Sequence, residues 1–396
     1  MRKSALSLGV VLVSWLFCVP ASADPPAFGD PVRGLTVAQL ERFTLGKDEF
    51  TAEEEIDEGL GPVFNEKSCV TCHLGPGAAV GGTNQRLETR FGTTTNGKFD
   101  PLAQFGGSLL QDHGIGLVTV SAGTHTFEAE TVPLAATIQT FRRTTPLFGL
   151  GLVDAVPDST FQFIAAVEAQ YGPGIAGKVH MVDDPVHGGK SVGKFGWKSQ
   201  VPNLMTFSGD AYLNEMGISN PLFPNENCPQ GDCAALAFDA ALFQPNDDGS
   251  GVRAFNDFMT MLAPPPRGPI TTDVVVGDVV FNAIGCSSCH TPLLVTGRSD
   301  IAALNFKAFQ PFSDFLLHDM GSLGDGIAQG DAGGTDIRTA PLWGLRTQTR
   351  LLHDGRATTV QDAILAHAGQ GAAARNRFAA LGPDLKAKLL AFLNSL

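Results

Sequence analysis

The sequence has 396 residues, with 40 acidic residues against 27 basic ones and a formal net charge of −13 at pH 7. An acidic balance of this size argues against nucleic-acid binding and favours a basic or locally complementary partner. The length makes two domains a reasonable expectation.

The N-terminus has the features of a secretory signal peptide. The basic residues Arg2 and Lys3 precede an apolar run over residues 6–19, and small residues follow where cleavage would occur. The run is short for a membrane span, and no later segment reaches the length of one. We therefore expect residues 1–23 to be removed, which leaves a chain with 25 basic and 40 acidic residues, a net charge of −15, and no membrane span.

Two copies of the motif C-x-x-C-H follow, at residues 69–73 and 286–290. On one helical turn, cysteines at positions i and i+3 and a histidine at i+4 face the same side. Two thioethers can then hold the edge of a porphyrin while the imidazole ligates its iron. A redox C-x-x-C pair or half of a zinc site would need no histidine directly after the second cysteine. The motifs predict two covalently bound haem c groups, attached through Cys69, Cys72, Cys286 and Cys289 and ligated by His73 and His290.

The remaining cysteines fit an oxidising compartment. Bacteria attach haem c outside the cytoplasm, so we expect a periplasmic protein. Cys18 lies in the signal peptide, which leaves Cys228 and Cys233 in a turn-rich loop. A disulfide that closes this small loop is the favoured interpretation, and free thiols or a metal site are the alternatives.

The first half of the chain combines helices with long glycine-rich loops. Residues 37–58 are charged and compatible with a helix that leads into the first motif, whereas residues 75–107 and 172–196 have the composition of loops. Residues 117–132 alternate apolar and polar side chains around Gly123, which predicts a small β-hairpin. Apolar side chains at helical spacing predict two further helices, over residues 158–171 and 252–262.

Three consecutive prolines at residues 264–266 mark the expected boundary between a domain of residues 24–265 and one of residues 266–396. An apolar helix over residues 273–284 would deliver the second motif, and residues 383–396 carry an apolar stripe that would pack against it. Between them, the glycine- and aspartate-rich residues 321–334 are expected to form a mobile connector, with a calcium-binding loop as the alternative. The expected fold is mainly α, with two c-type cytochrome domains, long loops and a small β-hairpin insertion.

A longer repeat surrounds the two motifs. Val63-Phe64-Asn65 precedes Cys69 at the same distance at which Val280-Phe281-Asn282 precedes Cys286. A phenylalanine shortly before the haem cysteines can pack on the porphyrin, so the repeat suggests one cytochrome unit used twice. Coincidence in a short tripeptide is the alternative.

His367 is a candidate iron ligand on the C-terminal side. Residues 359–362 resemble a capping box that opens a helix, and on that helix Val360, Ile364 and His367 share one face. His367 could therefore point into the second haem pocket. A lone histidine on an apolar face is more often a core residue, so the pattern alone leaves both interpretations open.

Several stretches resemble bacterial di-haem proteins. Residues 352–364 resemble the H-D-G and T-L-x-x-A-V element of di-haem cytochrome c peroxidases and of the enzymes that mature the methylamine dehydrogenase cofactor. More closely, the chain from about residue 30 onward resembles the di-haem oxidoreductase family, whose members are described as peroxidases or as thiol-oxidoreductase-like. The other stretches that carry this resemblance are residues 61–68, 146–152, 195–198, 214–217 and 317–321.

The resemblance implies roles for further residues. It places His367 at the sixth-ligand position of the second haem, where the peroxidases have methionine and the maturation enzymes have tyrosine. Met320 is the rival ligand, and His318 and His353 are expected to hydrogen-bond backbone groups or haem propionates. Glu215, in an E-M-G element, matches the glutamate that acts as acid and base in the di-haem peroxidases, and a solvated loop carboxylate is the alternative.

Trp197 has two interpretations: by resemblance it would relay electrons between the haems, and by residue type it could equally be a core tryptophan. For the first haem, the candidate sixth ligands are His113, His125, His180 and His187, none of which lies in a recognisable motif. The alternative is an open, five-coordinate iron, which is what a haem that activates peroxide needs.

These expectations converge on a periplasmic di-haem c-type oxidoreductase with peroxidase-like activity. A small donor protein of the cytochrome c or cupredoxin type would deliver electrons to the C-terminal haem, and peroxide or another small oxidant would be reduced at the N-terminal haem. Two other functions stay open: an electron-transfer cytochrome without catalysis, and oxidative modification of a partner protein.

Overall fold

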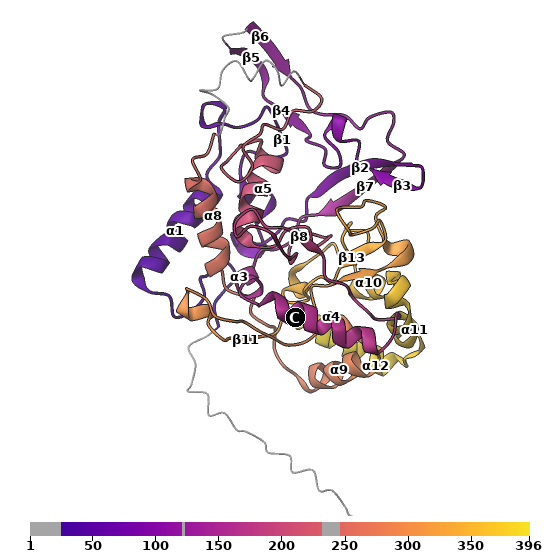
Figure 1. Ribbon diagram of the computed structural model, residues 1–396. Coiled ribbons are helices and arrows are strands. Elements are labelled where there is room, and N and C mark those ends of the chain that lie inside the picture. Colours follow the sequence, from indigo (N-terminus) through magenta and orange to yellow (C-terminus); the bar gives the residue numbers. More distant parts are fainter. Residues whose placement is uncertain (1–24, 121–122, 232–245) are drawn as a thin grey trace, which may run out of the picture.

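The computed structural model describes residues 25–120, 123–231 and 246–396 (Figure 1). The expected signal peptide lies outside these residues, as does Cys233, the expected disulfide partner of Cys228. Cys228 itself is disulfide-bonded. In the described part of the chain, no helix is both long enough and apolar enough to cross a membrane.

Two helix pairs lie in different parts of the molecule (Figure 1). The first pair consists of α1 (Val37–Thr51) and α8 (Ser250–Met261), and the second of α9 (Thr272–Ala283) and α12 (Pro383–Leu393). They are the two most extensive contacts between elements of the described chain. Each C-x-x-C-H motif therefore follows one helix of such a pair, α1 before the first motif and α9 before the second.

The two pairs are packed in the same way. In each pair one glycine, Gly46 or Gly277, leaves no room for a Cβ against the partner helix, so the two backbones approach closely. Phenylalanine rings then close each contact. The ring centroids lie 5.3 Å apart for Phe43 and Phe258 and 5.2 Å apart for Phe281 and Phe392.

The other helices lie between or beside these pairs. Asn203 caps α5 (Leu204–Met216) by accepting a hydrogen bond from Thr206 N at 2.8 Å. Thr359 caps α10 (Val360–Ala366) in the same way, which confirms the predicted helix start. The remaining α-helices described are α2 (Cys69–Cys72), α3 (Leu150–Asp154), α4 (Asp158–Gln170) and α11 (Ala372–Ala380).

Antiparallel strands are more numerous than the sequence predicts, so the expected mainly α fold is confirmed only in part. A three-stranded sheet has the order β3 (Lys98–Asp100), β2 (Leu87–Thr95), β7 (Ile138–Arg143). Residues 75–107, predicted as loops, thus contain two strands. The pattern of β2 is hard to recognise because the face that carries Glu88 and Arg90 lines a cavity and is polar.

The other strands form two-stranded sheets, and one of them, between β8 and β9, lies within residues 172–196, which were predicted as loops. These strands are β1 (Val63–Phe64), β4 (His113–Gly114), β5 (Gly116–Val120), β6 (Gly123–Phe127), β8 (Met181–Asp183), β9 (Lys190–Val192), β10 (Leu294–Val295), β11 (Ala308–Phe309), β12 (Leu317–Asp319) and β13 (Asp336–Arg338).

The predicted hairpin is the pair β5 and β6, and the predicted helices are present with shifted ends. The helix expected over residues 37–58 ends at Thr51, because Ala52 leaves helical backbone angles with φ −62° and ψ 146°. Only a short 3₁₀ turn follows, at Ile56–Glu58.

The V-F-N repeat does not mark one structure used twice. In the first copy, Phe64 lies in strand β1 and pairs with His113 of β4, whereas in the second copy Phe281 lies within helix α9. The tripeptide match is therefore a coincidence, since three residues do not determine secondary structure. The feature that is repeated is the helix pair.

Residues 321–334 are anchored rather than mobile. One oxygen of Asp325 lies 2.9 Å from Arg142 Nε and the other lies 2.9 Å from Lys198 Nζ. All three side chains are almost fully buried, so this segment supplies the counter-charge that the two buried cations need. Because both oxygens are paired with cations, Asp325 gives no support to the calcium alternative.

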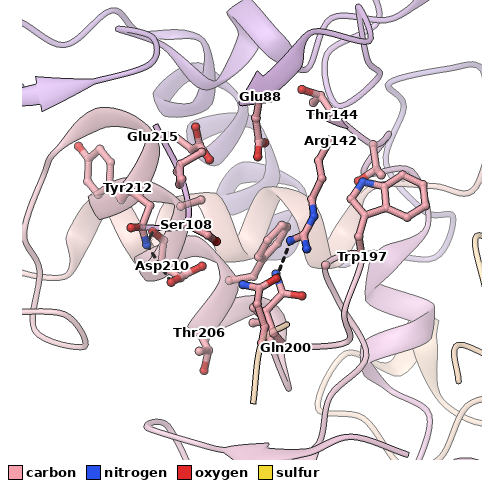
Figure 2. A pocket seen from close by; sticks show the side chains of 18 of the residues that line it. Glu88, Ser108, Arg142, Thr144, Trp197, Gln200, Thr206, Asp210, Tyr212 and Glu215 are labelled. Atoms are coloured by element: carbon pink, nitrogen blue, oxygen red, sulfur yellow. Dashed lines mark hydrogen bonds between the residues drawn. The ribbon is translucent and has the colours of Figure 1, made fainter. Parts of the chain in front are cut away.

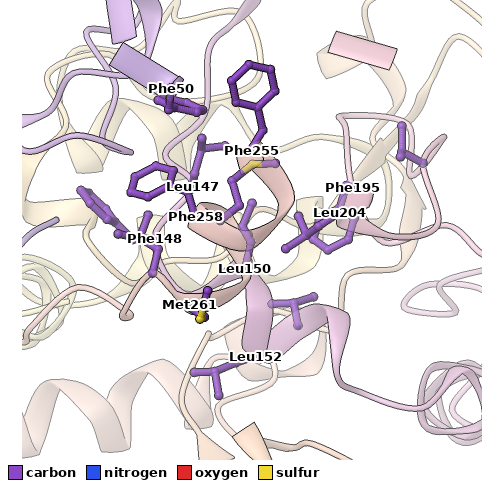
Figure 3. Packing of buried hydrophobic residues seen from close by; sticks show 14 of the residues in the cluster. Phe50, Leu147, Phe148, Leu150, Leu152, Phe195, Leu204, Phe255, Phe258 and Met261 are labelled. Carbon is purple, nitrogen blue, oxygen red and sulfur yellow. The ribbon is translucent and has the colours of Figure 1, made fainter. Parts of the chain in front are cut away.

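Two clusters of buried hydrophobic side chains form the core. The larger one gathers side chains of α1, α3, α5 and α8, among them Phe50, Leu150 and Phe258 (Figure 3). It also takes in Leu316 and Trp343, so it draws on both sides of the expected boundary at residues 264–266. The smaller cluster surrounds α9 and α12.

Candidate functional site

A cavity of about 1370 Å³ lies beside the first C-x-x-C-H motif. Cys69, Cys72 and His73 line it, together with the polar face of β2, the end of β7 and one side of α5. Residues 328–331, which belong to the anchored segment, also contribute to the wall. Pockets for drug-sized ligands measure about 300–1,000 Å³, so this cavity has the size that a larger, macrocyclic group requires.

The side chains of the first motif fit a haem better than a free metal ion. Burial lowers the pKa of His73 to about 4, so its imidazole is neutral at pH 7 and can ligate iron. Burial raises the pKa of Cys69 to about 12 and raises that of Cys72 as well, and neither cysteine forms a disulfide. Protonated thiols are poor metal ligands. Within the described residues, these three side chains form no compact group of metal ligands.

Glu215 lies near the C-terminal end of α5, beside Glu88 of β2 (Figure 2). Asn65 Nδ2 donates a hydrogen bond to Glu215 Oε2 at 2.7 Å. Burial, together with the nearby charge of Glu88, raises the pKa of Glu215 to about 8, against the lowering effects of Arg90 and of the hydrogen bond from Asn65. Glu215 therefore belongs to a helix at the cavity, not to a solvated loop, and can exchange a proton close to neutral pH.

The four histidines considered as sixth ligands at the first motif do not present a nitrogen to the cavity. His113 and His187 are largely exposed, and each pairs with a neighbouring aspartate, at 2.7 and 3.0 Å. His125 lies on β6 and is not part of the cavity wall. His180 does line the cavity, but its Nδ1 bonds a backbone carbonyl at 2.8 Å and its Nε2 accepts from a backbone N–H at 3.1 Å.

Trp197 lies where the first cavity meets the C-terminal half of the chain. Its Nε1 donates to the carbonyl of Arg143 at 2.9 Å, and its own carbonyl accepts from Arg338 N at 2.8 Å. The His353 ring lies edge-on to the indole, 6.1 Å away between centroids. Figure 2 shows Trp197 on the other side of the view from Glu215. This position is compatible with an electron relay and with a packing role.

At the second motif, two imidazole rings lie close together, tilted by 57° to each other. His290 Nδ1 bonds the carbonyl of Phe312 at 3.0 Å, and His367 Nδ1 bonds the carbonyl of Ala363 at 2.7 Å. In both histidines these bonds occupy Nδ1 and leave Nε2 for a metal. The two ring centroids lie 6.5 Å apart. Because a metal–imidazole bond is about 2 Å long, two imidazoles on opposite sides of one metal have centroids roughly 6 Å apart.

Met320, the rival ligand, lies beside His367, because both side chains border Gly371. His318, expected to bond backbone groups or haem propionates, has side-chain partners in the described chain: its nitrogens contact Asp314 at 3.0 Å and Gln370 at 3.1 Å. The Nε2 atom of His353 makes no hydrogen bond within the described chain, and its ring packs against Trp197 instead.

Sequence reasoning missed the polar residues that face the first motif. Glu88 and Arg90 form an ion pair of 2.7 Å on one face of β2, and their spacing of two residues was the available signal. Asn65 was noticed only as part of the V-F-N tripeptide. Arg143, the last residue of β7, also lines the cavity and had no recognisable motif.

Comparisons with known proteins agree with the chemistry of these motifs. A family model described as "Di-haem oxidoreductase, putative peroxidase" matches residues 134–396, which is more than half of the chain. This region contains Trp197, Glu215 and the second motif, whereas the first motif precedes it. No curated protein matches the chain.

Three solved structures are distantly similar. The first is hydrazine synthase of Kuenenia stuttgartiensis, with 12% identity over 100% of both chains and a TM-score of 0.38. The second is a MauG-like protein associated with microbial copper homeostasis, with 15% identity over 95% of both chains and a TM-score of 0.41. The third is a variant of the diheme peroxidase BthA from Burkholderia thailandensis, with 16% identity over 55% of this chain and 68% of that chain and a TM-score of 0.31. These scores are too low to support an argument about details.

Proposed function

Because the chain belongs to the di-haem oxidoreductase family, we propose that it is a periplasmic peroxidase that holds two haem c groups covalently. Electrons would enter at the haem of the second motif, and peroxide would be reduced at the haem of the first. The observation that carries this proposal is an asymmetry. His367 faces His290 at 6.5 Å, whereas no second histidine of the described chain presents a nitrogen to the first cavity.

The residues of the first cavity divide the chemistry between them. Bound haem would supply a redox-active iron with one open coordination position there. Glu215 takes a proton from the peroxide and returns it to the leaving oxygen. Asn65 holds Glu215 Oε2 through its 2.7 Å hydrogen bond, which leaves Oε1 to carry the proton. Arg90 stabilises the ionised carboxylate of Glu215 while its proton is on the substrate.

The second motif would act as the electron-entry site. His290 and His367 would ligate its iron through their Nε2 atoms, since Nδ1 of each is held by a carbonyl. Methionine ligation raises the potential of a haem, so two imidazoles predict a lower potential here than in peroxidases with methionine at this position.

Trp197 would carry electrons from the second haem to the first. It lines the first cavity and bonds Arg338, which belongs to β13 of the C-terminal half. The electron donor would be a small protein of the cytochrome c or cupredoxin type. A basic surface on that donor would complement the acidic excess of this chain, 40 acidic residues against 27 basic ones.

Electron paramagnetic resonance of the holoprotein, combined with a peroxide assay using a reduced donor, tests the proposal. We expect one high-spin ferric haem, one low-spin haem and turnover of hydrogen peroxide. Two low-spin haems in every redox state would contradict an open site and would favour an electron carrier. A high-spin haem without peroxide turnover would also contradict the proposal and would favour oxidative modification of a partner protein.

A further inference from the structure

Four arginines line the first cavity, and only one of them lacks a carboxylate partner in the described chain. Arg86 pairs with Asp112 at 2.8 Å, and Arg90 pairs with Glu88 at 2.7 Å. Arg142 pairs with Asp325, as described above. The fourth, Arg143, has no acidic side chain of the described chain within ion-pair distance. Three of the four cavity arginines therefore have a counter-charge in the described chain, and Arg143 has none.

Arg143 is buried despite this, with 5% of its surface exposed. Its Nε donates to the carbonyl of Leu352 at 3.2 Å and its Nη1 to the carbonyl of Thr144 at 3.4 Å. Nη2 donates to no group of the described chain. Burial lowers the pKa of Arg143 to about 10, which still leaves the guanidinium charged at pH 7. A buried cation without a counter-ion is costly, so the completed site is expected to contain an anion at this position.

The group that the first motif would attach brings such an anion. Haem carries two propionate side chains, which are carboxylates, and a guanidinium binds carboxylates through parallel hydrogen bonds. We propose that Arg143 binds a propionate of the haem attached at the first motif. The inference rests on the haem site of the proposed function, but it does not depend on peroxide being the substrate.

Arg143 would then connect the cofactor to Trp197. The guanidinium carbon lies 5.7 Å from the centre of the indole ring, and the Arg143 carbonyl accepts the indole N–H at 2.9 Å. The Arg143 N–H in turn donates to the carbonyl of His353 at 2.7 Å. One residue thus contacts the cavity, the candidate relay and the C-terminal half, so it is a positioning residue as well as a binding residue.

Redox titration and resonance Raman spectra of the holoprotein test this role, with variants Arg143→Met and Arg143→Lys. A cation beside the haem favours the less positive ferrous form. We therefore expect Arg143→Met to shift the ferric–ferrous equilibrium of the N-terminal haem about tenfold toward ferric, or about 59 mV. Arg143→Lys keeps the charge but loses the planar fork, so it should alter the propionate-bending band with a smaller change in potential.

Arg338→Met is the matched control. Arg338 is also buried, at 6% exposed, and donates to the carbonyl of Gly196 at 2.7 Å, but it does not line the first cavity. The Arg338→Met variant should keep the wild-type potential and propionate band of the N-terminal haem. The proposal is overturned if both Arg143 variants keep the wild-type potential and propionate band, or if Arg338→Met changes them as much. Should Arg143→Met fail to fold, the band of Arg143→Lys still decides the question. The outcome of this test does not depend on peroxide turnover. A failure of this proposal can therefore be distinguished from a failure of the proposed function.

Discussion

The two C-x-x-C-H motifs have the same residue types at the same spacing but are embedded in different local structures. Only residues 284–285 separate α9 from Cys286, whereas residues 52–68 separate α1 from Cys69. The longer connection includes β1 and Asn65, and Asn65 reaches Glu215 at 2.7 Å. At the second motif, α9 leads directly into the cysteines, and the ring of His367 lies 6.5 Å from that of His290.

The proposed function implies that the C-x-x-C-H motif alone does not determine what each haem does. Both motifs supply two thiols and one imidazole. At the first motif, Asn65 holds the buried carboxylate of Glu215, whereas at the second motif the ring of His367 lies 6.5 Å from that of His290. The difference between the two motifs therefore lies in the residues around them.

Substitution of Glu215 should produce the largest change. Glu215→Gln keeps the size of the side chain but removes its proton transfer, and this contribution is typically 10²–10⁴-fold. We expect kcat for peroxide to fall by at least about 100-fold with both haems still attached, measured by stopped-flow turnover.

Glu226→Gln is the matched control for this experiment. Burial raises the pKa of Glu226 to about 8 as well, but this residue does not line the cavity. Activity close to wild type in Glu215→Gln, or an equal loss in both variants, would contradict the proposed role of Glu215 in proton transfer.

Asp325→Asn should strongly destabilise the link between the two halves. It would leave Arg142 and Lys198 buried without their shared counter-charge, and breaking a buried ion pair costs about 3–5 kcal/mol. Thermal unfolding followed by circular dichroism would show the loss. As a control, Asp384→Asn removes an exposed pair with Lys388, which should change the stability far less. Equal stability of the two variants would contradict the anchoring role of Asp325.

His367→Ala should change the spin state of the second haem only. Loss of the facing imidazole should convert its low-spin ferric signal to a high-spin one, while the signal of the first haem stays as it was. Met320→Leu should have no such effect. If Met320→Leu removes the low-spin signal and His367→Ala preserves it, Met320 is the ligand of the second haem. The proposed ligation by His367 would then be wrong.

The smallest expected effect concerns pH. If Glu215 accepts the proton first, kcat/KM for peroxide should rise with pH through an apparent pKa near 8, because the ionised fraction of Glu215 rises there. Asn65 donates a hydrogen bond that favours the ionised form. Asn65→Ala should therefore raise this pKa and move the rise in activity to higher pH.

Asn282→Ala tests the same tripeptide position at the second motif. Asn282 lies on the exposed side of α9, and its side chain bonds only Asp278 of its own helix in the described chain. It should leave the pH profile unchanged. A profile without a rise near pH 8, or one that Asn282→Ala shifts as far as Asn65→Ala does, would contradict the pairing of Asn65 with Glu215.

The features predicted from the sequence were those with a strong local signal. Helices with apolar stripes, the cap at Thr359 and the hairpin around Gly123 were all found. The polar cavity wall was not predictable, because β2 carries Glu88 and Arg90 where a buried strand would show apolar residues. Contacts across the chain were also beyond local patterns: Asn65 and Glu215 are 150 positions apart, and Arg142 and Asp325 are 183 apart.

The restriction of sequence patterns to neighbouring residues also explains two wrong predictions. The V-F-N tripeptide predicts a structural repeat, but its first copy lies in a strand and its second in a helix. The frequent glycine and aspartate of residues 321–334 predict a mobile segment, but the segment is anchored. Its order comes from two cations that lie far away in the sequence and that only the tertiary structure brings to Asp325.

The position of Asp325 also limits how this gene can be divided or recombined. A fragment that ends at Pro264 would retain Arg142 and Lys198 but lose the carboxylate that both contact. Exchange of the C-terminal half with that of a relative would succeed only where the incoming half provides an acid at this position. These three positions are therefore expected to co-vary among homologues, and chimaeras that respect the triad should be recovered as soluble holoprotein more often than those that do not.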